Sequence, residues 1–412
     1  MQDLTTKFEL ELGQLLKQYF GDEELRGMNL SVIPRNEESN KVSEIINDFY
    51  RNQLDININN CNERVKLDRT ITYSEKKLEP DKFFALMLDL GRLCISSSKL
   101  NLASQIFKKI NKSSKKKFFK AESMLELGNV FSRRADWTRS LQSIINAEKL
   151  YKENDDSTGL AKCYNLLGSI YGERGNTEKA KYYFLESLSL MDTESESEMI
   201  ANLYTNLGVI DNIYGNTQDG VKQLNNALII FNKLGYHHRM AEVYHNIGMM
   251  YFESGDNESS LKAFDEGIEI AKRGRFISIL CLLYVAKSEV LIAEKDINSA
   301  AIFAEKAFEI SHDVDDKLTV ADIYRIKGII ERHLKNYKLS EDYLFNSLRI
   351  NEGLKNRMNI AETSFELAVL YEEIENSKNK TLYLETAKDY YKQINASHKL
   401  KLIDNMLGVE AA

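Results

Sequence analysis

Four stretches of eight residues repeat one pattern along the chain: AKCYNLLG at 161–168, ANLYTNLG at 201–208, AEVYHNIG at 241–248 and ADIYRIKG at 321–328. In each stretch a tyrosine stands three residues after the alanine and four before the glycine, and the stretches are spaced by multiples of 40 residues. Looser copies keep the register at 84–91, 121–128, 281–288 and 361–368, with a 37-residue step between the first two. Self-similarity at a fixed period is typical of repeat proteins, so the sequence predicts eight repeated units.

A turn follows each well-formed stretch, seven residues after its last small residue. Six of these turns read Gly175-Asn176, Gly215-Asn216, Gly255-Asp256, Lys295-Asp296, Lys335-Asn336 and Glu375-Asn376. Glycine tolerates the left-handed backbone that ends a helix, and Asn or Asp caps the helix that follows. Apolar residues recur at helical spacing on both sides of the turn. Each unit is therefore expected to be a hairpin of two helices, here called A and B.

The pattern resembles the tetratricopeptide repeat. The third unit carries Tyr164-x2-Leu167-Gly168-x2-Tyr171, followed by Ala180, Phe184 and Ser187 on helix B. The period of 40 residues exceeds the 34 usual in that family. The resemblance, which spans about 80–412, implies an all-α fold, a right-handed superhelical α-solenoid of about eight helical hairpins with an N-terminal helical segment. Neighbouring hairpins are expected to bury each other's faces, because one hairpin cannot bury both of its own.

The composition agrees with helix almost throughout. The 412 residues include two prolines, both within the first 80 positions, and proline breaks helices. A net charge of −7 disfavours direct nucleic-acid binding, and no apolar run is long enough for a membrane span. The four cysteines are far apart, which predicts buried thiols of a reducing cytoplasm rather than disulfides or zinc ligands.

No pattern of catalytic or cofactor-binding residues occurs. The chain lacks a phosphate-binding loop, a dinucleotide fingerprint, a zinc-protease motif and a nucleophile elbow. His237, His238 and His245 are the only histidine cluster. The first two are expected in the loop after a B helix, too few and too dispersed to form a metal site. We therefore expect no catalytic residues, no cofactor and no metal.

The period divides the chain into three predicted parts. Residues 1–80 lack the repeat and contain helical patterns at 4–19 and 40–52, which predicts either a helical cap or an effector segment. Residues 81–396 are the predicted repeat array. Residues 397–412 are expected to hold a closing helix and a tail.

Binding residues are expected on the A helices, which line the concave face of such arrays. Positions 2, 5, 6, 9, 12 and 13 of each A helix form one stripe. Asparagine donates and accepts at once, so regularly spaced asparagines suit the backbone of an extended peptide. The stripe contains the predicted peptide-binding residues Asn165, Asn202, Asn206, Asn212, His245, Asn246, Met249, Arg325 and Arg332.

The architecture and the asparagine placement also resemble the bacterial peptide-pheromone receptors of the Rap, NprR and PlcR kind. That resemblance implies a signalling peptide held by Asn206 and Asn246 and an N-terminal output segment. Three functions stay open: a cytoplasmic scaffold or adaptor that binds a peptide or protein in its concave groove, a peptide-regulated signalling switch with residues 1–80 as output module, or an enzyme with its site in residues 1–80. An exposed end of the array could also pair with a second copy, which leaves a homodimer open.

Overall fold

The computed structural model describes residues 7–21, 24–25, 58–192, 197–311, 317–393 and 396–408. The helix expected at 40–52 lies outside these residues. Within the described ranges the chain is helical, and no strand occurs there. The chain divides into two compact units, residues 1–193 (unit 1) and 194–412 (unit 2), each of which is described by itself.

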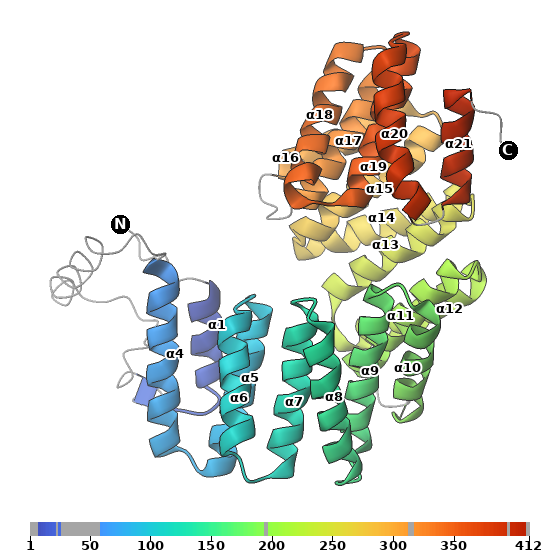
Figure 1. Cartoon of the computed structure of the whole chain (residues 1–412). Helices are drawn as coiled ribbons and strands as arrows, with labels where there is room; N and C mark the ends of the chain where they lie inside the picture. The colour runs from blue at the N-terminus through green and yellow to red at the C-terminus, as the bar shows by residue number, and fades with distance from the viewer. Residues whose placement is uncertain are drawn as a thin grey trace, which may run out of the picture. The chain divides into compact units, whose positions relative to one another are not determined.

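The described residues of unit 1 form two N-terminal helices and three hairpins, which can be followed in Figure 1. The N-terminal helices are α1 (Lys7–Leu16) and α4 (Ile58–Lys77). The hairpins are α5 (Pro80–Ser96) with α6 (Leu100–Ser113), α7 (Lys117–Ser132) with α8 (Trp137–Lys152), and α9 (Ser157–Glu173) with α10 (Thr177–Ser189). Phe8, Leu12 and Leu16 of α1 share one hydrophobic core with Leu67 of α4 and Leu86 of α5. The N-terminal helices are thus packed against the first hairpin.

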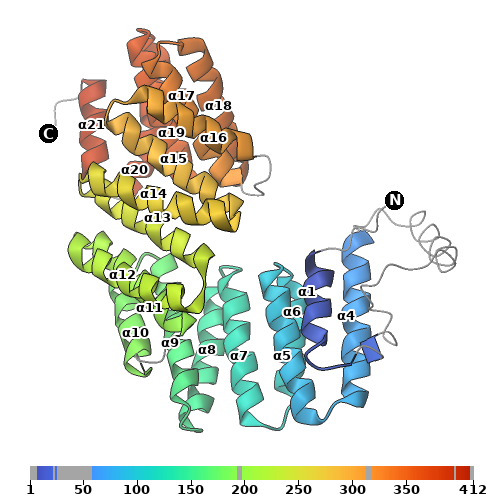
Figure 2. The ribbon, with the colours of Figure 1, turned by 180° about the vertical axis from the view of Figure 1, so that it is seen from behind.

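In the part of unit 2 that the structure describes, the chain forms five hairpins and a last single helix, which can be followed in Figure 2. The hairpins are α11 (Glu198–Ile213) with α12 (Thr217–Leu234), α13 (His237–Glu253) with α14 (Asn257–Gly274), α15 (Ile277–Ala293) with α16 (Ile297–Ile310), α17 (Lys317–His333) with α18 (Tyr337–Leu354), and α19 (Arg357–Glu373) with α20 (Ser377–Gln393). The last helix is α21 (Ser397–Leu407). The described residues of the two units therefore hold the eight predicted hairpins.

The turns inside the hairpins follow the predicted chemistry. Gly175 has a φ of +76°, and the next residue, Asn176, accepts a hydrogen bond from the backbone N–H of Lys179. The N–H of Asn176 bonds back to the carbonyl of Tyr171, which satisfies a carbonyl at the end of α9. The corresponding residue Lys295 adopts the same left-handed backbone with a φ of +63°. The hairpin geometry thus persists where the glycine is missing.

The glycine that closes each eight-residue stretch marks the crossing of helices A and B. A Cβ atom on Gly248 would lie 2.3 Å from the ring of Phe264, and one on Gly208 would lie 2.9 Å from the backbone oxygen of Gly220. At the same crossing the hydroxyl of Ser260 donates to the carbonyl of Gly248 at 2.8 Å. Close approach therefore requires glycine at these positions.

One expected position is wrong. His237 and His238 lie in the first turn of α13 and not in a loop before it. Gly235 takes a left-handed conformation with a φ of +71°, and the N–H of Tyr236 bonds to the carbonyl of Phe231. This backbone conformation ends α12 at Leu234. Only two residues therefore separate α12 from α13, which begins at His237.

Candidate functional site

The A helices of unit 2 form a continuous face, which we call the A-helix wall (α11, α13, α15, α17 and α19). Each of these helices contacts the next A helix as well as its own B helix. A cavity of about 350 Å³ opens on the α11–α15 part of this wall. Its lining residues are Asn202, Thr205, Phe231, His238, Arg239, Glu242, Val243, His245, Asn246, Ser278, Ile279 and Leu282.

Equivalent positions of successive repeats line this cavity. Asn202, Glu242 and Leu282 are the second residues of three consecutive eight-residue stretches, and they lie 40 residues apart. Thr205 and His245 are both fifth residues. Six of the lining residues are thus at positions 2, 5 or 6 of the repeat. Three neighbouring hairpins contribute side chains to one site.

The cavity combines an apolar lining with amide groups. Phe231, Val243 and Ile279 are buried and supply the apolar part. Asn202 and Asn246 supply amides that donate and accept hydrogen bonds. An apolar pocket with a few polar groups is the usual form of a small binding site.

The charged residues at the cavity pair with each other. The guanidinium of Arg239 donates to Glu242 at 2.8 Å, and Nδ1 of His238 lies 3.4 Å from the same carboxylate. All three side chains belong to the first two turns of α13. The cavity therefore presents no large excess of one charge.

His245 is a partly buried histidine among the cavity residues. Burial lowers the pKa of its imidazole below the usual value, against smaller opposing effects of Asn246, Glu289 and Glu242. Its ring lies 6.0 Å from the ring of Phe264. The imidazole is consequently neutral at neutral pH and offers one donor and one acceptor.

The structure brings together three of the predicted binding residues, since Asn202, His245 and Asn246 line the cavity. Asn206 is partly buried on α11 but is not among the lining residues. Met249 packs against the hydrophobic core around α15.

Asn212 and Asn165 lie elsewhere. The amide nitrogen of Asn212 donates to Glu253 at 2.6 Å, and its oxygen accepts from Thr217 at 3.3 Å. Asn165 is on α9 of unit 1, and its side-chain oxygen is buried without a hydrogen-bond partner.

The two predicted arginines are engaged in ion pairs along the A-helix wall. Arg325 donates to Glu289 of the preceding A helix at 2.7 Å. Arg332 bonds Glu366 and Glu373 of the following A helix at 3.2 and 2.6 Å. Both guanidiniums therefore tie neighbouring repeats together, which the sequence pattern alone does not indicate.

Sequence reasoning missed the cavity residues Thr205, Arg239, Glu242, Ser278 and Leu282. The signal that would have found Glu242 and Leu282 is the 40-residue spacing from Asn202, applied to every residue type and not to asparagine alone.

The described ranges offer neither a metal site nor a membrane span. They contain no group of three or more His, Cys, Asp or Glu residues placed to hold a metal ion. Among the helices described there, none is both long and apolar enough to cross a membrane.

Comparisons with known proteins agree with the repeat architecture. The family model described as tetratricopeptide repeat matches residues 120–193 and 199–273. No curated protein matches the chain in sequence.

Several solved structures share the fold. The apo form of the quorum sensor NprR from B. thuringiensis aligns with a TM-score of 0.62 at 14% identity, over 81% of this chain and 94% of that one. A Rap protein complexed with competence and sporulation factor gives 0.59 at 14% identity, over 83% and 93%. The apo form of RapI gives 0.56 at 18% identity, over 68% and 99%.

At these identities the likeness is one of fold. It covers more of the chain than the repeats that the family model matches. Residues 120–193 and 199–273 thus match the tetratricopeptide repeat, and the fold of the chain resembles that of the Rap and NprR proteins.

Proposed function

We propose that this protein acts by binding and not by catalysis, and that it holds an extended peptide segment on the A-helix wall. The observation that supports this most is the cavity of about 350 Å³ lined by equivalent positions of α11, α13 and α15. A ligand that repeats along its length, as a peptide backbone does, suits a wall that repeats along its length.

The chemistry of the cavity favours a peptide segment without a strong charge. Asn202 and Asn246 can each bond a peptide C=O and N–H whatever the peptide's side chains. Arg239 and Glu242 satisfy each other at 2.8 Å. The apolar lining around Ile279 then accepts an aliphatic or aromatic side chain of the peptide.

The test is a peptide selection against the full chain, followed by affinity measurement on variants. Peptides from a displayed random library are synthesised with a fluorophore and titrated by anisotropy. The double variant Asn202→Ala, Asn246→Ala is expected to weaken binding by about tenfold or more, because two sets of hydrogen bonds are lost. Asn206→Ala is the matched control on the same wall and should leave the affinity nearly unchanged. Equal affinity of the double variant and the unsubstituted chain would contradict the proposed site.

A second candidate is a peptide-regulated switch. It is supported by the shared fold with a quorum sensor and with a Rap protein complexed with competence and sporulation factor. In this proposal residues 1–80 are the output module, 81–396 the array and 397–412 the closing helix and tail. The setting is the cytoplasm, in keeping with the buried free thiols of Cys94, Cys163 and Cys281.

Removing residues 1–80 distinguishes the switch from the plain scaffold. A truncated chain that stays soluble and binds the selected peptides, but no longer acts on its downstream partner, supports an output module. A truncated chain that aggregates indicates a cap, since α1 shares its core with α5.

A further inference from the structure

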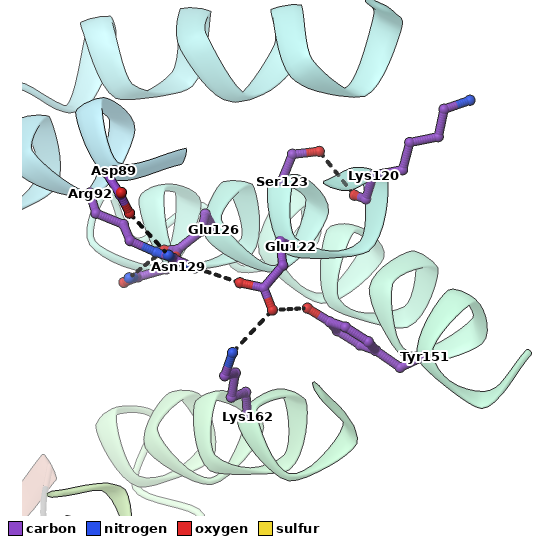
Figure 3. A network of polar contacts seen from close by, with 9 residues as sticks. All are labelled: Asp89, Arg92, Lys120, Glu122, Ser123, Glu126, Asn129, Tyr151 and Lys162. Atoms are coloured by element: carbon purple, nitrogen blue, oxygen red, sulfur yellow. Dashed lines mark hydrogen bonds and ion pairs between the residues drawn. The ribbon is translucent and has the colours of Figure 1, made fainter. Parts of the chain in front are cut away.

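A network of charged residues joins the hairpins of unit 1 (Figure 3). Glu122 of α7 accepts hydrogen bonds from Tyr151 at 2.7 Å and Lys162 at 3.0 Å, and it also bonds Arg92. Arg92 further donates to Glu126 at 2.7 Å. Burial alone would raise the pKa of the Glu122 carboxyl, but Lys162, Tyr151 and Arg92 together hold it below its usual value. The buried Glu122 carboxylate is therefore hydrogen-bonded to Tyr151, Lys162 and Arg92.

Four members of this network have counterparts in unit 2. Glu122, Glu126 and Tyr151 correspond in sequence to Glu362, Glu366 and Tyr391, 240 residues later. Arg332 takes the part of Arg92, although it lies three residues beyond the equivalent repeat position because the first two repeats are only 37 residues apart. The correspondence holds in space, since Arg332 bonds Glu366 at 3.2 Å as Arg92 bonds Glu126. We call these four residues of unit 2 the second quartet.

The helix that follows each quartet is also in register. The N–H of Ala396 bonds to the carbonyl of Tyr391 at 3.0 Å, and that of Asp156 bonds to the carbonyl of Tyr151 at 3.0 Å. Cys163 of α9 and Ile403 of α21 are equivalent in sequence, and both are fully buried. Helix α21 therefore occupies the place that α9 occupies in unit 1.

The second quartet lacks the lysine. The equivalent of Lys162 is Leu402, which cannot neutralise a carboxylate. The side chain of Glu362 is 30% exposed, against 4% for Glu122. The phenol of Tyr391 is buried, with the residue 4% exposed, and its oxygen has no hydrogen-bond partner.

Arg332 bonds carboxylates other than that of Glu362. The residue equivalent to Arg133 is Glu373, and Arg332 bonds it at 2.6 Å. The guanidinium nearest to Glu362 is that of Arg325, whose Nε lies 4.0 Å away and whose other nitrogen already bonds Glu289 at 2.7 Å.

The surroundings of Glu362 carry an excess of negative charge. Two guanidiniums, of Arg325 and Arg332, face five carboxylates, those of Glu289, Asp322, Glu362, Glu366 and Glu373. The ammonium of Lys399, on the neighbouring turn of α21, lies 5.2 Å from the centre of the Phe365 ring. The local field therefore favours an added cation.

We propose that the second quartet binds a primary ammonium group from a ligand, which takes the place that Lys162 fills in unit 1. The ammonium pairs with Glu362, and the carboxylate in turn accepts from the Tyr391 hydroxyl, as Glu122 accepts from Tyr151. The source is a lysine side chain or the free N-terminus of a peptide. This site involves α17, α19 and α20 and stands whether or not the α11–α15 cavity binds a peptide.

The test uses the full chain and three probes: acetyl-Ala-Lys-Ala-amide, Ala-Ala-Ala-amide with a free N-terminus, and acetyl-Ala-Ala-Ala-amide. The methyl NMR signal of Ile403, which is buried on α21 beside the site, reports binding. At least one charged probe is expected to shift this signal in a saturable way, and the uncharged probe is not. The charged probe that shifts it identifies the source of the ammonium.

Variants locate the effect. Glu362→Gln should weaken binding of the active probe by about tenfold, because a charged hydrogen bond is lost. Leu402→Lys should abolish it, since the new ammonium occupies the site, and Lys162→Leu should leave the Ile403 response unchanged. If Leu402→Lys does not fold, Tyr391→Phe, which should weaken binding, replaces it. The proposal is overturned if neither charged probe shifts Ile403, if the uncharged probe shifts it equally, or if Glu362→Gln binds as tightly as the unsubstituted chain.

Discussion

Tyr151 and Tyr391 occupy equivalent positions but differ in their partners, so the same substitution should have different effects at the two sites. The hydroxyl of Tyr151 donates to Glu122 at 2.7 Å, and both residues are buried. Burial raises the pKa of the Tyr151 phenol, so the hydroxyl stays protonated and remains a donor at ordinary pH. The oxygen of Tyr391 has no partner.

Tyr151→Phe removes a hydrogen bond to a charged acceptor, which contributes about 1.5–3 kcal/mol. Tyr391→Phe removes a buried oxygen that has no hydrogen-bond partner, so it should not lower the free energy of unfolding. Because each 1.4 kcal/mol is a factor of ten, opening of α7 and α8 should become about 10- to 100-fold more frequent in Tyr151→Phe.

Hydrogen exchange followed by mass spectrometry measures how often these helices open. Peptides from α7 and α8 report on the neighbourhood of Tyr151 alone. Amides of these helices should exchange faster in Tyr151→Phe, while those of α19 and α20 should be nearly unchanged in Tyr391→Phe. Equal protection of α7 and α8 in Tyr151→Phe and in the unsubstituted chain would refute the assigned role of the hydrogen bond.

Two further predictions concern unit 2. Gly208→Ala places a Cβ 2.9 Å from the backbone oxygen of Gly220 and should lower the free energy of unfolding by about 1–3 kcal/mol. Gly353→Ala, in open space on α18, should raise the free energy of unfolding by about 0.5–1 kcal/mol. Urea titration measures both changes. A Gly208→Ala chain as stable as the original would contradict the close helix crossing. His245→Gln should flatten the fall of the melting temperature between about pH 7.5 and 5.5. Its pKa is lowered in the folded chain, so the unfolded chain binds the proton more readily and stability is lost as pH falls below the unfolded value; an unchanged slope would refute this.

Much of the fold could be predicted because the signals are local. The turn at Gly175 and Asn176 needs only a left-handed residue and a cap. The glycine at Gly248 needs only the ring of Phe264 opposite it. The loop expected at His237 was wrong. The connection between α12 and α13 has only two residues, and so short a segment cannot be recognised as a loop from its amino-acid composition.

The site was less predictable, because its geometry depends on distances between repeats. Asn202 and Asn206 share a helix and a residue type, yet only Asn202 lines the cavity. Arg325 and Arg332 have the composition of a ligand-binding stripe, but carboxylates 36 and 41 residues away bind them. Such pairings follow from how hairpins stack and not from the pattern within one hairpin.

The walls of the cavity come from residues 40 positions apart, and this has an evolutionary consequence. Duplication or loss of one whole unit would change which side chains face each other while each hairpin kept its own interior. Ligand recognition can then change when whole repeats are rearranged. The fold stays stable because each hairpin still packs against a compatible neighbour. Lys162 and Leu402 illustrate the outcome, since they occupy equivalent positions 240 residues apart and have opposite chemistry.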